Sequence, residues 1–312
     1  MTTTGERGIS PDVEHQATRP PFNEIIETRQ LSANSLLCVG LDPVLENIPV
    51  SFKEAFPFFN DDRVRDFADS TIIKKFCEAI ADKLNPYVSA WKPNAAFFER
   101  YGSEGWSALT STIKSLNEID PSIPVILDAK RADIGSTNSG YTDMLFKSGA
   151  DAITVNPYFG IGSLSPFFER AGNKGLIILC RTSNPEAAEM QDVVVKNSRF
   201  GEVPYYVMVA HMAEEARQGN PNVAIVMGAT NPNQLREARG IFKGQILVPG
   251  LGRQGGQPED LVGAFDERGI GVIANNSSAI IHASKGDDFL EAAEAAAKHW
   301  QGEINKVRPH AA

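Results

Sequence analysis

The sequence predicts an α/β protein that folds as a single closed (β/α)8 barrel, the TIM barrel. Eight short runs rich in Val, Ile and Leu recur from residue 36 onward without alternating polar residues. Such runs are typical of parallel strands buried on both faces. Amphipathic stretches lie between them, and eight β-then-α units make up a TIM barrel. The alternative is an open, doubly wound sheet, which usually has fewer strands and one reversal of strand order.

The expected elements follow one another along the chain with no low-complexity linker after residue 20. The strands are Leu36–Asp42, Val88–Asn94, Val125–Lys130, Ala152–Pro157, Leu176–Ser183, Ala224–Thr230, Gln245–Leu251 and Val272–Ser278. The helices, recognised by apolar residues three or four positions apart, are Arg63–Leu84, Trp106–Leu116, Val207–Gln218, Asn233–Arg239 and Asp287–Trp300. Residues 21–312 are therefore predicted to be one barrel domain.

Composition excludes several classes of protein. The chain has 312 residues, 42% of them hydrophobic, which is enough for a sizeable core. Its net charge of −9 disfavours non-specific nucleic-acid binding, because binding to a phosphate backbone needs a basic surface. No apolar run reaches the roughly 18 residues of a transmembrane helix. Residues 1–20 are polar and lack the apolar segment of a signal peptide, so we expect a disordered leader on a cytoplasmic protein.

Neither the cysteines nor the histidines predict a metal site. The three cysteines, Cys38, Cys77 and Cys180, lie far apart inside apolar runs, as reduced core residues do in a cytosolic protein. The five histidines have no ligand partner at a credible spacing. The chain also lacks a Walker loop and a G-x-G-x-x-G motif, so no metal or redox cofactor is predicted.

Polar side chains gather at the C-terminal ends of the expected strands, the face where TIM barrels build their active sites. The set comprises Asp42, Lys92, Asp128, Lys130, Asn156, Thr182, Ser183, Thr230, Gln254 and Ser277. A single aspartate at a strand end is more often a turn or helix-cap residue. Because a whole set converges here, it predicts a functional site.

The sharpest local feature is the charged run Leu127–Asp133. Asp128 and Lys130 are two apart on one strand, so their side chains should point to the same face, at the barrel mouth. Asp133 follows in the next loop. A lysine buried between carboxylates would stay protonated and could donate a proton in a nearly dry cavity. A solvated charged turn is the alternative, which the position at the end of an apolar strand disfavours.

A glycine-rich loop, Val248–Gly256, includes the end of the seventh expected strand. Its backbone N–H groups could hold a phosphate, which barrels often bind after strands seven and eight. A flexible turn is the alternative. Arg253 and Gln254 in the middle of the loop favour ligand binding.

Together these residues resemble the orotidine 5′-phosphate decarboxylase family, and its longer bacterial branch most closely. The resemblance runs from about Phe22 to Ala297. It rests on seven segments in order: Cys38–Pro43, Trp91–Glu99, Leu127–Thr137, Thr154–Gly160, Thr182–Pro185, Val226–Thr230 and Val248–Gly256. It implies a cofactor-free barrel enzyme that converts orotidine 5′-monophosphate (OMP) to UMP and CO2 in pyrimidine biosynthesis.

The resemblance also implies roles for the charged residues. Lys130 would protonate the C6 carbanion that loss of CO2 leaves on the pyrimidine, and Asp128 would sit beside the substrate carboxylate. Lys92 and Asp133 would complete an alternating Lys–Asp–Lys–Asp network around Lys130 and contact the ribose.

Other residues are expected to bind the substrate: Asp42, Ile134, Thr137, Ser183, Gln254, Arg253, Gly252 and Ser278. Asp42 would bind the ribose, Ser183 the amide edge of the pyrimidine, and Gln254 would bridge base and phosphate. Related enzymes are homodimers in which the residues matching Asp133, Ile134 and Thr137 reach into the partner's site.

The sequence departs from the family at the phosphate. After the eighth strand the family usually has Ser-Arg, and this arginine binds the phosphate, whereas Ser278 stands there in this chain. Losing a bidentate charged contact would cost on the order of 2–5 kcal/mol of binding. Arg253 could supply the charge from the adjacent loop, Ser278 could be an engineered change, or strong phosphate dependence could have been lost.

Two other functions stay open. A sister barrel acting on sugar phosphates, such as a keto-gulonate phosphate decarboxylase or hexulose phosphate synthase, uses the same charged motif with Mg²⁺. That metal would need a further carboxylate at a strand end, where this chain has Lys92-Pro93-Asn94. A catalytically impaired nucleotide-binding barrel is suggested by Ser278 alone, although it would have no reason to keep Asp128 and Lys130.

Overall fold

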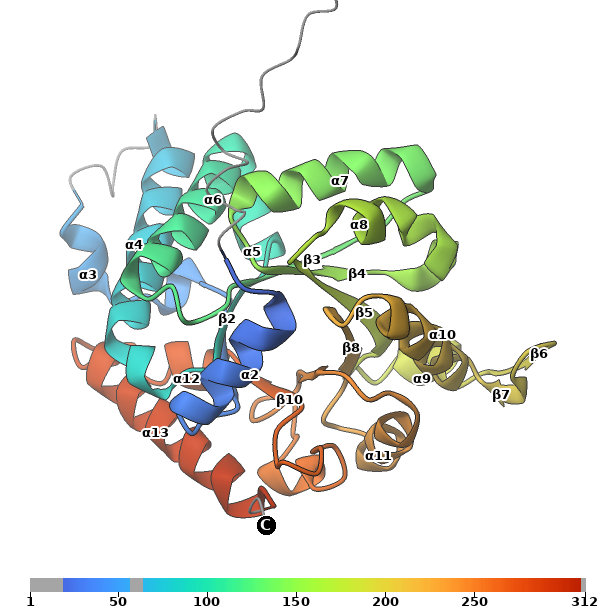
Figure 1. The fold of residues 1–312 in the computed structure, drawn as a ribbon. Helices are drawn as coiled ribbons and strands as arrows, with labels where there is room; N and C mark the ends of the chain where they lie inside the picture. Colours follow the sequence, from blue (N-terminus) through green and yellow to red (C-terminus); the bar gives the residue numbers. More distant parts are fainter. Residues whose placement is uncertain (1–18, 57–63, 310–312) are drawn as a thin grey trace, which may run out of the picture.

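The barrel is closed in the computed structural model, which describes residues 19–56 and 64–309 (Figure 1). Eight strands form one parallel sheet in the order β2-β1-β10-β9-β8-β5-β4-β3. Two parallel bridges, Trp91 with Val125 and Asn94 with Asp128, join its two edges. The predicted (β/α)8 barrel is therefore confirmed, and an open doubly wound sheet is excluded.

The eight strands coincide with the eight apolar runs. They are β1 (Leu37–Leu41), β2 (Ala90–Pro93), β3 (Ile126–Arg131), β4 (Ala152–Val155), β5 (Gly175–Arg181), β8 (Val223–Met227), β9 (Ile246–Val248) and β10 (Val272–Asn276). All except β3 end one to three residues earlier than predicted. Asp42, Ser183 and Ser277 therefore lie in the loops at the barrel mouth, whereas Lys130 lies on β3 itself.

Helices surround the barrel (Figure 1). The five expected helices are α4 (Arg65–Leu84), α6 (Gly102–Ile119), α10 (Tyr205–Gly219), α11 (Pro232–Ile241) and α13 (Phe289–Val307). Those that the sequence analysis missed are α2 (Phe22–Ser32), α3 (Val50–Glu54), α5 (Ala96–Glu99), α7 (Gly135–Ser148), α8 (Ser165–Arg170), α9 (Ala187–Gln191) and α12 (Ser278–Ile281). The sequence analysis did not predict α7 because the first half of this helix consists mostly of Gly, Ser, Thr and Asn, which leaves no apolar periodicity.

Helix α2 fills the N-terminal end of the barrel and crosses the front of Figure 1. Its Phe22 and Ile26 are buried in one cluster with the lower inward-facing side chains of the strands. Gly175 at the start of β5 permits this packing, since a Cβ there would lie 2.4 Å from the Phe22 ring. The C-terminal end of the barrel is the end where the cavity lies.

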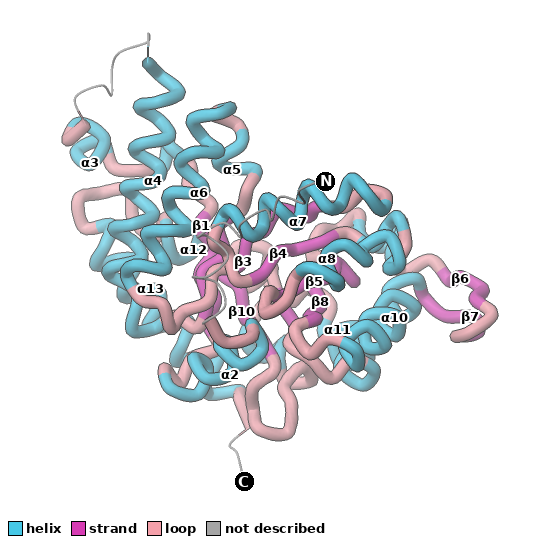
Figure 2. The backbone as a smooth tube through the Cα atoms, turned by 45° about the horizontal axis from the view of Figure 1, so that its top comes forward, coloured by secondary structure: helices cyan, strands magenta, loops and turns pink. Residues whose placement is uncertain are grey.

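An antiparallel hairpin interrupts the unit that follows β5. Its strands β6 (Val194–Asn197) and β7 (Gly201–Pro204) form a two-stranded sheet of their own and project from the barrel (Figures 1 and 2). The sequence analysis did not predict it, because strands of four residues with no long apolar run give little periodicity.

The predicted leader, residues 1–20, lies outside the described residues except for Arg19 and Pro20. Arg19 belongs to the folded domain, since its guanidinium forms an ion pair with the buried carboxylate of Asp151 (Nη2–Oδ2 2.7 Å). Among the helices of the two described ranges, none is long and apolar enough to cross a membrane.

Candidate active site

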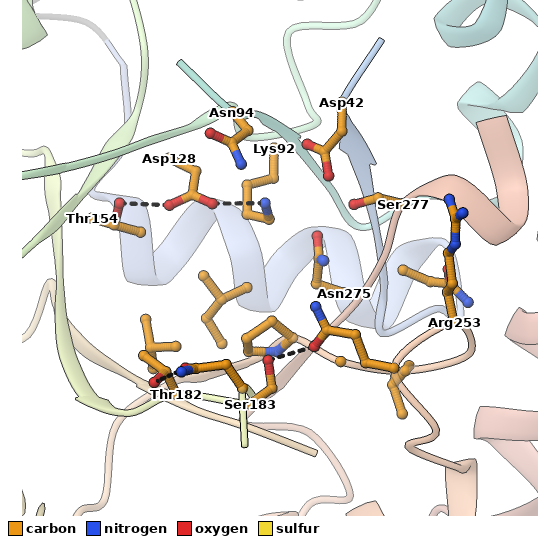
Figure 3. Close-up of a pocket in the computed structure, with 18 of the residues that line it drawn as sticks. Asp42, Lys92, Asn94, Asp128, Thr154, Thr182, Ser183, Arg253, Asn275 and Ser277 are labelled. Atoms are coloured by element: carbon orange, nitrogen blue, oxygen red, sulfur yellow. Dashed lines mark hydrogen bonds and ion pairs between the residues drawn. The ribbon is translucent and has the colours of Figure 1, made fainter. Parts of the chain in front are cut away.

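A cavity of about 500 Å³ opens at the C-terminal end of the barrel, and each barrel strand or the residue after it contributes a lining side chain. Leu179, Val226 and Leu247 provide apolar surface. The predicted site residues that line the cavity are Asp42, Lys92, Asp128, Lys130, Ser183, Arg253, Gln254 and Ser278. Figure 3 shows several of them pointing into the same space from opposite walls.

Asp128 on β3 lies at the centre of a charged network, and Figure 3 shows its contacts with Lys92 and Thr154. Its Oδ2 accepts a hydrogen bond from Lys92 Nζ at 3.0 Å, and its Oδ1 accepts from Lys130 Nζ at 2.7 Å. Thr154 Oγ1, on the neighbouring strand β4, donates to the same Oδ1 at 2.8 Å. Two of these three bonds join opposite charges, which makes them short and strong.

Burial and ion pairing act in opposite directions on this network. Burial raises the pKa of the Asp128 carboxyl, but the ammonium groups of Lys92 and Lys130 outweigh it and hold that pKa well below its usual range. Burial lowers the pKa of the Lys92 ammonium, while Asp128 and Asp42 raise it, with a net increase above its ordinary value. Asp128 and Lys92 are therefore both charged at neutral pH.

The backbone at Lys130 is irregular, so its side chain reaches Asp128 in a way that the alternation of a regular strand does not predict. The register between β3 and β4 shifts after Leu127, and Lys130 has a φ of +48°. Its backbone N–H donates to Thr154 Oγ1 at 2.9 Å, so Thr154 fixes both the strained backbone and the carboxylate. Such a conformation costs about 1–3 kcal/mol and is found mainly at functional sites.

The expectation that Lys130 is buried is wrong. Its side chain is 47% exposed, whereas that of Lys92 is 5% exposed. The bulge at Lys130 directs its ammonium to the open mouth of the cavity, and the buried cation of the network is Lys92.

Two loops meet at one side of the cavity. Ser183 Oγ, after β5, donates to Gln254 Oε1, in the glycine-rich loop after β9, at 2.6 Å. Gly250 makes this approach possible, because it has a φ of +102° and a Cβ there would lie 2.9 Å from the Ser183 Cβ. The contact joins two lining residues that are 71 positions apart in the sequence.

Asp133, Ile134 and Thr137 do not line the cavity of their own chain. They lie where α7 begins, and the Asp133 carboxylate accepts a hydrogen bond from the Ile134 backbone N–H at 2.6 Å. The Ile134 side chain is 63% exposed. Gly252 is also outside the lining, and its backbone packs against Asn276, whose Nδ2 would lie 2.9 Å from a Cβ at this position.

Thr154 is the site residue that the sequence analysis missed. It belongs to the Thr154–Gly160 segment, but it was not singled out. The available signal was a hydroxyl side chain on the inner face of the apolar strand β4, two positions after the inward-facing Ala152. Asn275, on β10, also lines the cavity and was not singled out, whereas Ser277, after β10, lines it as the set of strand-end residues predicted.

Within residues 19–56 and 64–309, no group of three or more His, Cys, Asp or Glu side chains is arranged to hold a metal ion.

The thiols of Cys38, Cys77 and Cys180 are buried, and none of them forms a disulfide. Burial raises the pKa of the Cys38 thiol to about 12, so it is protonated at neutral pH.

Comparisons of the sequence and of the structure with known proteins identify the same family. Residues 35–296 match the family described as "Orotidine 5′-phosphate decarboxylase / HUMPS family". Orotidine 5′-phosphate decarboxylase of Roseiflexus castenholzii is 39% identical over 290 residues, which cover 91% of this chain and 97% of the relative. The enzyme of the same name from Herpetosiphon aurantiacus is 40% identical over 279 residues, covering 89% and 95%. The structure of Leishmania donovani OMP decarboxylase is 33% identical, with a TM-score of 0.74, and covers 92% and 99%.

The charged network predicts a specific stability effect. The substitution Asp128→Asn should lower the free energy of unfolding at pH 7 by about 3–5 kcal/mol, because it leaves the buried Lys92 without its counter-ion. The folded-state pKa of Asp128 is depressed, so its stabilising contribution is full above about pH 4 and is lost as the pH falls towards the depressed value. Urea unfolding should therefore show a smaller difference from the wild type at about pH 3.

The matched control is Asp143→Asn, which removes the carboxylate of a surface pair with Arg170. It should change the free energy of unfolding by less than about 1 kcal/mol. An Asp128→Asn variant as stable as the wild type at pH 7 would contradict the account of the network.

Proposed function

The chain belongs to the orotidine 5′-phosphate decarboxylase / HUMPS family, and on that premise we propose that it converts OMP to UMP and CO2. The structural observation that best supports this reaction is the Lys92–Asp128–Lys130 array in the cavity. Residues 21–312 act as one catalytic barrel. The relatives at 39–40% identity bear the decarboxylase name, which favours this reaction over the sugar-phosphate chemistry of a sister barrel.

The placement of the two ammonium groups supports the following steps for the proposed reaction. The bond between C6 of the pyrimidine and its carboxyl group breaks, CO2 leaves, and the electron pair stays on C6. Lys130 Nζ, exposed at the mouth, donates a proton to C6 and takes one back from water afterwards. The Asp128 carboxylate lies beside the departing carboxylate, and the buried Lys92 holds Asp128 in place.

Binding of the nucleoside part uses the groups at the strand ends. Asp42 after β1 binds the ribose; its buried Oδ1 accepts no hydrogen bond from the described residues, which leaves it available to a sugar hydroxyl. Ser183 binds the amide edge of the pyrimidine. Gln254, already in contact with Ser183, lies between base and phosphate.

The phosphate is bound by Arg253. Lys92 and Lys130 are paired with Asp128, whereas the structure gives Arg253 no carboxylate partner among the described residues. Arg253 and Ser278 line the same cavity, and close packing of Gly252 against α12 brings their two loops together, since a Cβ at Gly252 would lie 3.4 Å from that of Ala279. A guanidinium group can bind a phosphate through two hydrogen bonds, so Arg253 replaces a cation at position 278.

The active site is shared between two copies of the chain. Asp133, Ile134 and Thr137 lie outside the cavity of their own chain, and the apolar side chain of Ile134 is exposed. In the proposed homodimer they reach the partner's cavity, where Asp133 joins the charged network beside Lys130. The buried, unpaired cysteines fit a location in the reducing cytoplasm.

The reaction is tested by following the fall in ultraviolet absorbance as OMP is decarboxylated in the presence of EDTA. The wild type should turn over, and Lys130→Ala should lower kcat by about 10²–10⁴-fold while UMP still binds, because the proton donor is lost. The control Lys196→Ala, on the exposed hairpin, should keep full activity. A wild type without turnover overturns the proposed reaction, and activity that EDTA abolishes favours the metal-dependent sister chemistry.

Substitutions that move the arginine from position 253 to position 278 test which residue supplies the cation that binds the phosphate. Arg253→Ala should raise KM for OMP by about 30-fold or more, because it removes a charged contact. Ser278→Arg alone should change KM little, and adding it to Arg253→Ala should restore most of the lost affinity. An unchanged KM in Arg253→Ala contradicts the assignment, and a large gain from Ser278→Arg alone means that the wild type lacks a phosphate-binding cation.

A further inference from the structure

The loop that carries Ser183 has cavities on both sides. One, of about 320 Å³, is lined by Thr182, Met190 and Gln191, and the other, of about 720 Å³, is lined by Arg181, Ser183 and Asp192. Protein interiors are normally close-packed. Residues 182–192 therefore border open space on these two sides, and polar contacts at their ends contribute to their position, besides the packing of the buried Ala187.

Those contacts form a clamp at the base of the loop. Arg181, the last residue of β5, donates from Nε to Asp192 Oδ1 at 2.7 Å and from Nη2 to Asp192 Oδ2 at 2.8 Å. The next pair repeats the arrangement, since the Thr182 backbone N–H donates to Gln191 Oε1 at 2.7 Å and Gln191 Nε2 donates to Thr182 Oγ1 at 3.0 Å. The two ends of the loop are thus tied by adjacent residue pairs.

The Arg181–Asp192 pair is the strong half of the clamp. The Arg181 side chain is 4% exposed, so its guanidinium depends on Asp192 as its counter-ion. The hydrogen bonds from Arg181 lower the pKa of the Asp192 carboxyl below its ordinary value, so it stays ionised at neutral pH. A planar bidentate pair fixes direction as well as distance.

We infer that the Arg181–Asp192 clamp positions Ser183 for its contact with Gln254 and so sets the affinity for the base of the nucleotide. This inference rests on the proposed function. Ser183 lies two residues beyond Arg181, and its Oγ donates to Gln254 Oε1 at 2.6 Å, while Thr230 Oγ1 donates to the Ser183 carbonyl at 3.0 Å. Arg181 and Asp192 are outside the lining of the active-site cavity, so they act through Ser183 as positioning residues.

The test is a double-mutant cycle between Asp192→Asn and Gln254→Ala, read as KM for OMP and as the Kd of UMP by calorimetry. Each single variant should raise KM and Kd about tenfold, with a smaller change in kcat. The double variant should be weaker than Gln254→Ala by clearly less than tenfold, because both changes remove the same Ser183–Gln254 contact. Additive effects, or an unchanged KM in Asp192→Asn, overturn the inference.

Further measurements separate positioning from general damage. Ribose 5-phosphate carries no base, so its Kd should be the same in the wild type and in Asp192→Asn; equal weakening of both ligands overturns the inference. Arg181→Lys keeps the buried charge but loses the bidentate geometry, so it should repeat the effect of Asp192→Asn if that variant does not fold. The control Glu202→Gln removes a carboxylate that pairs with Lys196 on the nearby hairpin, and it should leave KM and both Kd values unchanged.

The outcomes also distinguish this inference from the proposed reaction. The proposed reaction is disproved, and the role of the clamp is supported, if the wild type binds UMP without decarboxylating OMP and the variants have non-additive effects on the Kd of UMP. The reaction is supported, and the role of the clamp is disproved, if the wild type decarboxylates OMP and the effects of the two substitutions on KM and Kd are additive.

Discussion

The ion pairs of Asp128 with Lys92 and Lys130 are the interactions on which the rest of the site depends. Lys92 is buried inside the barrel, and that position is tolerable only because a carboxylate neutralises it there. The same carboxylate holds the ammonium of Lys130 at the mouth, and Thr154 fixes both partners from the next strand. One side chain thus connects the stability of the barrel with the position of the proposed proton donor.

The barrel supplies this network with an enclosed environment. Helix α2 fills the N-terminal end, so ligands have access from the C-terminal end, where the strand-end residues meet. There the glycine-rich loop carries the cation Arg253 and the adjacent Gln254, which contacts Ser183. Because the two residues are neighbours, the roles proposed for them, binding of the phosphate by Arg253 and contact with the base by Gln254, involve the same loop.

The sequence predicted much of this arrangement, because long apolar runs mark buried parallel strands and because strand ends meet on one face of a barrel. It could not predict the bulge that exposes Lys130, since backbone strain depends on the partner strand and on Thr154. Helix α7 and the β6–β7 hairpin lack apolar periodicity. The Arg181–Asp192 pair gave no signal, because neither residue belongs to a motif and their meeting depends on how the loop folds.

In the proposed homodimer, the array Lys92–Asp128–Lys130 decarboxylates OMP only with Asp133 of a second copy beside it. The most direct measurement mixes two inactive variants, Lys130→Ala and Asp133→Asn, under conditions that let subunits exchange. In a mixed dimer, one cavity combines Lys130 of one chain with Asp133 of the other, so an equal mixture should recover about a quarter of the wild-type OMP decarboxylation. No recovery on mixing, or full activity of Asp133→Asn alone, would contradict the claim.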